Sequence, residues 1–172
     1  PIFPRHDGNF KGDLTKNVPY VLQQAAETIN VGDYPTVALA LAAIPASGGE
    51  LFFPCGTYNV STPLIIGNSQ QHIRLKGPVA TRSNAYSQCV NLNYTAASGS
   101  LLVLHNAVDF EIDGINLTYS HASYADSLVV VDGTSAEIVF RNSGFRGIAG
   151  SSQAAARLLY LKATYDVTIE HC

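Results

Sequence analysis

This chain of 172 residues has few charged side chains, no methionine and no tryptophan. Lys, Arg, Asp and Glu make up 13% of it, against about a quarter of a typical globular domain, and the formal net charge is −3. It contains no basic run and no alternation of basic with aromatic residues, so we expect no nucleic-acid partner. The longest apolar stretch, around residues 37–44, is too short to span a bilayer. No signal peptide is visible, and no membrane insertion is expected.

Cysteine is also scarce. Cys55, Cys89 and Cys172 are an odd number and lack the spacing of metal ligands. We therefore expect reduced, mostly buried thiols, which favours assembly in a cytoplasm over secretion.

What the chain does contain is an internal repeat. Two apolar blocks recur three times between Leu101 and the last residue, about 28 residues apart each time, which is a solenoid period. The first block occupies 101–104, 128–131 and 158–161, and the second occupies 110–113, 138–141 and 167–170. This spacing is close to one coil of a parallel β-helix, and it predicts an all-β solenoid. Because the chain starts at Pro1 and stops after a strand-like segment, we expect the coils to continue beyond residue 172.

The region before the repeat divides into two parts. Residues 1–30 are expected to form an extended or helical arm, or neck connector, with a short helix from a cap at Asn17 to about residue 27 and a strand over 28–31. Residues 31–172 are expected to form the first coils. Asp33 is predicted to cap a short helix, whose apolar residues at helical spacing would cover the first coil: Val37, Ala40, Leu41 and Ile44.

Residues 29–79 resemble the start of the pectate-lyase-3-like β-helix family, which includes many bacteriophage tailspikes. The resemblance rests on the pattern GG-x-LFFP-x-GTY over 48–58 after a short helix, together with Ile29-Asn30-Val31, Pro63-Leu64 and 73–77. It implies a right-handed parallel β-helix, frequently trimeric, that acts on polysaccharides as a lyase or hydrolase or is a structural part of a virion. Cys55 departs from the family, which usually has a small residue or proline there.

Side chains alternate between the two faces of a strand, so Phe110, Ile138 and Val167 should lie one over another inside the coil. The outward positions then stack as Glu111, Val139 and Thr168 in one row, and as Asp113, Arg141 and Glu170 in the next. Asp113 and Glu170 are the candidate catalytic carboxylates, about 9.6 Å apart with Arg141 between them, near the upper limit for an inverting glycosidase. The favoured interpretation is instead an ion-pair ladder on an exposed sheet.

A third set of stacked positions holds only acidic residues. Asp109, Glu137 and Asp166 each stand immediately before a strand, at the same corner of successive coils. They could hold Ca²⁺ or line a lyase-type groove, because Ca²⁺ takes several oxygen ligands. The favoured interpretation is that they cap corners and face water, so no cofactor is expected unless it is Ca²⁺.

Two further groups of side chains are candidates for a functional role, one at the ends of predicted strands and one on a predicted loop. His105, Asp132 and Lys162 end the first block of each copy and could form another mixed ladder. Tyr119, His121 and Tyr124 lie on the segment that joins the first two copies, and they are candidates for a platform on which sugar rings stack. A subunit contact or a solvated loop is the favoured interpretation of that segment.

The resemblance implies part of a phage tailspike or other virion appendage, a homotrimer that contacts other tail proteins and binds or depolymerises bacterial surface polysaccharide. Its active site would lie at the edge of this segment or outside it, and it would be assembled in the host cytoplasm. The alternatives are a polysaccharide lyase or glycoside hydrolase, which could be secreted, and a virion protein with no catalytic activity.

Overall fold

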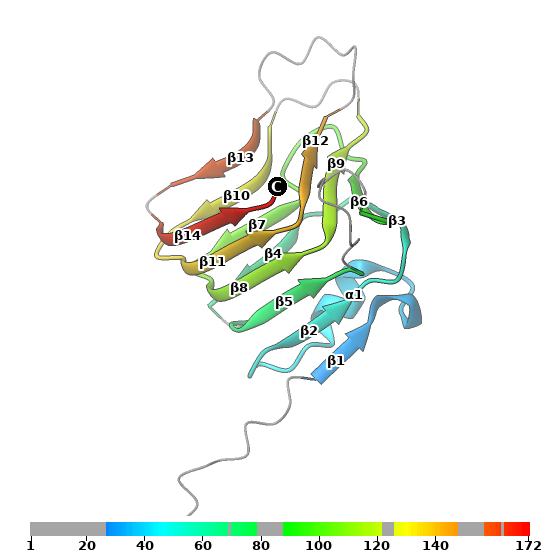
Figure 1. Ribbon diagram of the computed structural model, residues 1–172, viewed down its shortest axis with the longest axis horizontal. Coiled ribbons are helices and arrows are strands. Elements are labelled where there is room, and N and C mark those ends of the chain that lie inside the picture. Colours follow the sequence, from blue (N-terminus) through cyan, green and yellow to red (C-terminus); the bar gives the residue numbers. More distant parts are fainter. Residues whose placement is uncertain (1–26, 69, 79–87, 122–125, 148–156, 163) are drawn as a thin grey trace, which may run out of the picture.

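The computed structural model describes residues 27–68, 70–78, 88–121, 126–147, 157–162 and 164–172, and it shows three parallel sheets wound into a solenoid (Figure 1). Sheet A has six strands: β1 (Glu27–Asn30), β2 (Gly49–Phe52), β5 (Ile73–Lys76), β8 (Val108–Asp113), β11 (Ala136–Arg141) and β14 (Tyr165–Glu170). Sheet B consists of β3 (Gly56–Val60), β6 (Val90–Tyr94), β9 (Ile115–Tyr119) and β12 (Gly144–Arg146). Sheet C consists of β4 (Leu64–Gly67), β7 (Leu102–His105), β10 (Ser127–Asp132) and β13 (Arg157–Leu161).

From β2 onward the chain visits sheets A, B and C in turn, so each coil adds one strand to every sheet. Each strand therefore pairs in parallel with its counterpart one coil away. Connections between parallel strands are right-handed in nearly all proteins. The predicted right-handed parallel β-helix is confirmed.

The predicted register is confirmed at the central column. Ile138 pairs with Phe110 on one side and with Val167 on the other, and Phe110 and Ile138 are at most 1% exposed. The repeat pattern missed the third strand of each coil, β9 and β12. Gly144 lies inside β12, whereas Gly114 and Gly133 lie between strands with positive φ.

A short helix covers the first coil, as predicted, but it begins later. Helix α1 (Val37–Ala42) is capped by Thr36, whose Oγ1 accepts a hydrogen bond of 3.2 Å from the backbone N–H of Leu39. Asp33 ends a separate 3₁₀ turn, η1 (Val31–Asp33), so its predicted role as the cap of α1 is wrong. The apolar face of the helix is buried as expected, at Val37, Ala40, Leu41 and Ile44. The predicted arm lies outside the described residues up to residue 26, and β1 occupies the predicted strand.

Two of the three cysteines form a disulfide, which corrects the expectation of reduced thiols. Cys55 and Cys89 each stand directly before a strand of sheet B, and Gly56 pairs with Val90 in the next coil. This register brings their Cα atoms to 4.9 Å, a normal disulfide separation. The pairing was missed because the repeat is clear only after Leu101, so these coils were not aligned. Cys172 is a free thiol.

The outer faces of the three sheets differ in chemistry. Sheet A carries charged side chains, whereas sheet B carries mainly amides and hydroxyls. Sheet C carries an apolar row whose members pair across all four strands, and Ile65 in this row is 61% exposed: Ile65, Val103, Val130 and Tyr160. No helix in the described ranges has the length and apolar character needed to cross a membrane.

Candidate functional site

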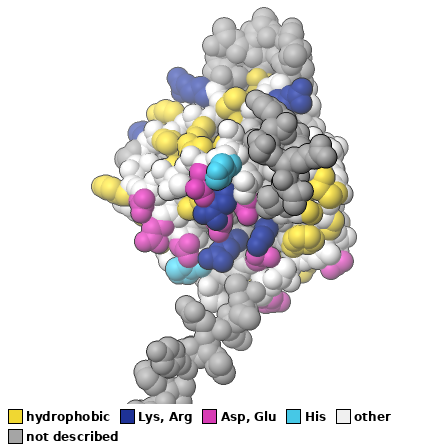
Figure 2. Space-filling model, in the orientation of Figure 1, with side chains coloured by type: hydrophobic (Ala, Val, Ile, Leu, Met, Phe, Trp, Pro, Cys, Tyr) yellow, Lys and Arg dark blue, Asp and Glu magenta, His cyan; other side chains and the backbone are white. Residues whose placement is uncertain are grey.

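The outer face of sheet A carries a cluster of charged side chains of both signs, and we call it the charged face. Its members are Glu50, Arg74, Lys76, Glu111, Asp113, Arg141 and Glu170. They point outward because they alternate with buried residues such as Leu75 and Ile112. Figure 2 shows charged side chains of both signs side by side in the orientation in which sheet A faces the reader.

Arg141 is the centre of an ion-pair ladder on this face. Its Nη1 lies 3.1 Å from Oε1 of Glu111, and its Nε donates to Oε1 of Glu170. The hydrogen bond from Arg141 to Glu170 raises the pKa of the guanidinium above its ordinary value, although partial burial opposes the shift. The guanidinium is therefore positively charged at any ordinary pH.

The predicted row of Asp113, Arg141 and Glu170 is confirmed in register, but its contacts differ from those expected. Arg141 forms its ion pairs with Glu111 and Glu170, and among the described residues Asp113 has no ion pair within 4 Å. The Asp113 carboxylate instead accepts a hydrogen bond of 2.8 Å from the Nδ2 of Asn142. The carboxylates of Asp113 and Glu170 therefore differ in environment.

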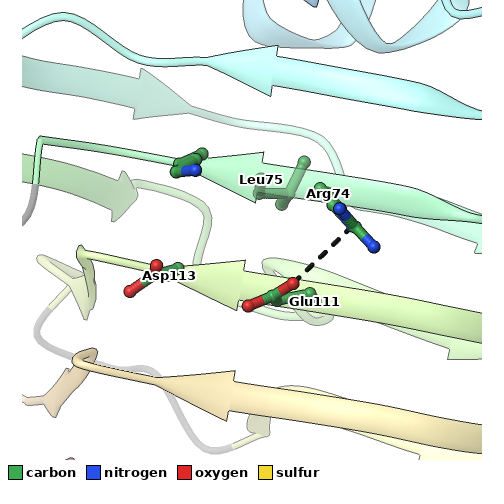
Figure 3. Close-up of a pocket in the computed structure, with 5 residues that line it drawn as sticks. Arg74, Leu75, Glu111 and Asp113 are labelled. Atoms are coloured by element: carbon green, nitrogen blue, oxygen red, sulfur yellow. Dashed lines mark ion pairs between the residues drawn. The ribbon is translucent and has the colours of Figure 1, made fainter. Parts of the chain in front are cut away.

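A shallow hollow lies on the charged face where β5 and β8 are neighbours. It is lined by Arg74, Leu75 and Lys76 of β5 and by Glu111 and Asp113 of β8, and Figure 3 shows Arg74 reaching toward Glu111. The Arg74 and Lys76 side chains are 56% and 50% exposed. Their nearest carboxylate contacts are long, 3.6 Å from Arg74 Nε to Glu111 and 4.0 Å from Lys76 Nζ to Glu50. Both cations are therefore accessible to a ligand in the hollow.

The hollow also holds a carboxylate pair that the sequence interpretation missed. Glu111 and Asp113 are two residues apart on one face of β8, which separates their Cα atoms by roughly 7 Å along the strand. The pair could have been predicted from the sequence, because residues two apart on a strand share a face. The stacked rows related acids on different strands and did not relate the two acids of one strand.

The acidic second residues of β8, β11 and β14 share a backbone conformation. Asp109, Glu137 and Asp166 have φ of 54°, 57° and 53°, and His72 occupies the same corner one coil earlier with φ of 57°. The left-handed region is uncommon for residues other than glycine, and Asp and His are enriched in it. The three acids occupy equivalent positions in successive coils, as predicted, but they lie inside the strands and not before them. The Asp109 carboxylate contacts His72 Nδ1 at 2.9 Å.

No group of three or more His, Cys, Asp or Glu side chains within the described ranges is arranged to hold a metal ion. The neighbouring corner contains a second imidazole–carboxylate contact, between His105 Nδ1 and Asp132 Oδ1 at 2.6 Å. These two residues pair in register, as predicted for the mixed ladder.

The predicted aromatic platform is wrong at Tyr119. Its side chain is 7% exposed and stacks in register on Tyr94, which is 1% exposed, because both residues occupy the last inward position of a strand in sheet B. It therefore packs in the core and cannot present a ring to a sugar. His121 is partly buried, and Tyr124 lies outside the described residues.

Comparisons with known proteins support the architecture. No family model matches the chain, and no curated protein matches it by sequence. Two crystal structures of pectin methylesterase from Aspergillus niger, in two deglycosylated forms, are similar to it. Their TM-scores are 0.59 and 0.58, with identities of 17% and 16%. Each match covers 86% of this chain and 55% of the esterase, so the chain spans about half the length of these proteins. The likeness shows a shared fold.

Proposed function

We propose that this chain is the β-helical part of a polysaccharide-acting protein and that the polysaccharide lies over the charged face of sheet A. The observation that carries the proposal is the hollow, where two half-exposed cations stand beside two carboxylates. The fold supports it, because similar structures belong to an enzyme named for its action on pectin. Six strands spaced about 4.8 Å apart also give an elongated surface suited to an extended chain.

Within the hollow, different residues have different roles. Arg74 and Lys76 donate hydrogen bonds to sugar hydroxyls or to anionic substituents, and Asp113 accepts from hydroxyls. Glu111 lies between Arg74 and Arg141, so it is held in place. If the protein cleaves its ligand, Asp113 and Glu111 are the carboxylates positioned for acid–base chemistry, in place of the pair formed by Asp113 and Glu170.

Binding to a panel of immobilised polysaccharides, neutral and acidic, tests the proposal. We expect the double variant Arg74→Ala, Lys76→Ala to lose at least tenfold in affinity for the polysaccharide that the parent chain binds. Arg146→Ala is the matched control, because it removes an exposed arginine from the outer face of sheet B and should leave binding unchanged. Equal effects of the two variants, or no binding to any polysaccharide, would contradict the proposal.

Release of reducing ends or unsaturated sugars from the bound polysaccharide distinguishes an enzyme from a binding scaffold. In the enzyme, Asp113→Asn should abolish release while binding is retained. Dependence of release on added Ca²⁺ would favour the lyase. Asp109, Glu137 and Asp166 would then be the first residues to substitute in a search for the Ca²⁺ ligands.

A virion appendage is the second candidate function, and the sequence resemblance of residues 29–79 favours it. The structural comparisons match an enzyme and include no phage protein. The disulfide between Cys55 and Cys89 favours an oxidising compartment and thus a secreted protein over assembly in a cytoplasm. A solution mass three times the 18.3 kDa of the chain, with resistance to detergent, would support the homotrimeric appendage. A monomer that binds polysaccharide would support the secreted protein.

A further inference from the structure

The outer face of sheet B carries three asparagines in the acceptor pattern for N-linked glycosylation, Asn-x-Ser/Thr. They begin the segments Asn59-Val60-Ser61, Asn93-Tyr94-Thr95 and Asn116-Leu117-Thr118. In each segment the middle residue is buried, so the asparagine and the hydroxyl residue share the outward side. The sequence alone does not distinguish the three sites, but their contacts do.

Two of the three asparagines use the nitrogen that a glycan would occupy. Nδ2 of Asn93 donates to Oδ1 of Asn59 at 2.9 Å and to Oγ of Ser120 at 3.2 Å. Nδ2 of Asn116 donates to the carbonyl oxygen of Gln88 at 3.1 Å, and the Oδ1 of Asn116 is buried. Both side chains lie on inner strands of sheet B, where a sugar on Nδ2 would remove these hydrogen bonds and displace neighbouring side chains.

Asn59 differs from both. It lies on β3, the strand at one edge of sheet B (Figure 1). Asn59 is exposed, and so are Ser61 and Thr62 after it. Its Oδ1 accepts the hydrogen bond from Asn93, and its Nδ2 donates none to the described residues. A glycan on Nδ2 would therefore leave the hydrogen bond between the two asparagines intact.

A second, independent feature bears on the same site. Cys55, which forms a disulfide with Cys89, lies four residues before Asn59 in the sequence. Disulfides form in oxidising compartments. In a eukaryotic cell the compartment that forms disulfides also transfers glycans to asparagine. The two features thus point to the same environment.

We propose that Asn59 is an N-glycosylation site. The donor is an oligosaccharide linked through pyrophosphate to a polyprenyl lipid. A bond forms between Nδ2 and the anomeric carbon of the first sugar, the bond from that carbon to the pyrophosphate oxygen breaks, and the amide loses one proton as the lipid pyrophosphate leaves. The attached glycan stands beside the edge of β3 and hinders pairing of that edge with another chain.

Secretion of the full chain from yeast or insect cells tests the proposal. We expect intact mass and peptide mapping to show one glycan, at Asn59, which peptide N-glycosidase removes with conversion of that residue to aspartate. Asn59→Gln and Ser61→Ala should each abolish the modification. Asn93→Gln and Asn116→Gln are the matched controls, and they should leave its occupancy unchanged.

The disulfide serves as an internal control for passage through the secretory pathway. If the secreted chain contains the disulfide but Asn59 is unmodified, the proposal is wrong. It is equally wrong if glycans occupy Asn93 or Asn116 to the same extent as Asn59, because accessibility would then not select the site. Asn59→Gln should keep the circular dichroism of the parent, which separates loss of the acceptor from loss of the fold.

Discussion

At the scale of single residues, the guanidinium of Arg141 joins two carboxylates on neighbouring strands, those of Glu111 and Glu170. Because Arg141 is 42% exposed, water and salt screen these contacts. We expect Arg141→Ala to lower the free energy of unfolding in urea by about 0.5–1 kcal/mol, and by less in 1 M salt. Arg74→Ala is the control, and its effect should be smaller because the contact of Arg74 with Glu111 is longer. A larger effect at Arg74 would contradict the ladder.

Ser135 is a fully buried hydroxyl residue at a corner between sheets C and A. Its Oγ accepts a hydrogen bond of 3.0 Å from the backbone N–H of Ala107 and donates to the carbonyl oxygen of Asp132 at 2.7 Å. Ser135→Ala would leave a buried N–H without its partner, so we expect a loss of about 1–3 kcal/mol in the free energy of unfolding. The exposed Ser61→Ala should change it little. Similar losses in both variants would contradict this role for Ser135.

Residue-level predictions from the sequence succeeded where alternation along a strand determined the outcome. The stacking of Asp113, Arg141 and Glu170 follows from two-residue periodicity and register, both visible in the repeat. The contacts of Arg141 with one acid and not another depend on side-chain rotamers, which periodicity does not specify. Tyr119 was misplaced because its strand, β9, was not recognised, so an inward position was interpreted as part of a loop.

At the scale of elements, the disulfide links the strands β3 and β6 of adjacent coils across a separation of 34 residues. In the chain-entropy model a loop of this length stabilises a fold by about 4 kcal/mol. We therefore expect the double variant Cys55→Ser, Cys89→Ser to unfold at clearly lower urea concentration than the parent. Alkylation of the unfolded parent should label one cysteine before reduction and three afterwards. Three labelled cysteines before reduction would show that the disulfide does not form.

Helix and strand boundaries were predictable where turn residues bound an apolar run, as at β2 and β4. The start of α1 was not, because Asp33 and Thr36 are both good capping residues. Thr36 caps the helix because Asp33 is the last residue of the 3₁₀ turn and Tyr34 after it is extended. β12 was missed because it has only three residues and begins with Gly144.

For the whole molecule, stability depends on columns of side chains that continue from coil to coil. Phe140 is fully buried and its ring centroid lies 6.4 Å from Phe110 and 5.6 Å from Phe145. We expect Phe140→Ala to lower the free energy of unfolding by about 3–5 kcal/mol. Val139→Ala, at the adjacent outward position, should cost much less. Amide hydrogen exchange should show the Phe140 effect most strongly in β11 and in the two strands that pair with it, β8 and β14, because each coil contacts only its neighbours. Loss of protection confined to β2 would contradict this view.

The architecture could be predicted from the sequence because the repeat, the helix over the first coil and the pattern at residues 48–58 all specify the same fold. The activity could not, because one β-helix carries several chemistries on its outer faces and each face depends on only a few residues. The hollow formed by β5 and β8 combines residues from a coil before the clear repeat with residues inside it. Only the register between these coils brings them together.

We propose that a polysaccharide binds over the charged face of sheet A. Titration of the isotope-labelled chain with an oligosaccharide from the bound polysaccharide, followed by amide chemical shifts, tests this most directly. We predict that the largest shifts fall in β5 and β8, around Arg74, Lys76, Glu111 and Asp113. Shifts confined to sheets B or C, with β5 and β8 unchanged at saturation, would show that the polysaccharide binds elsewhere.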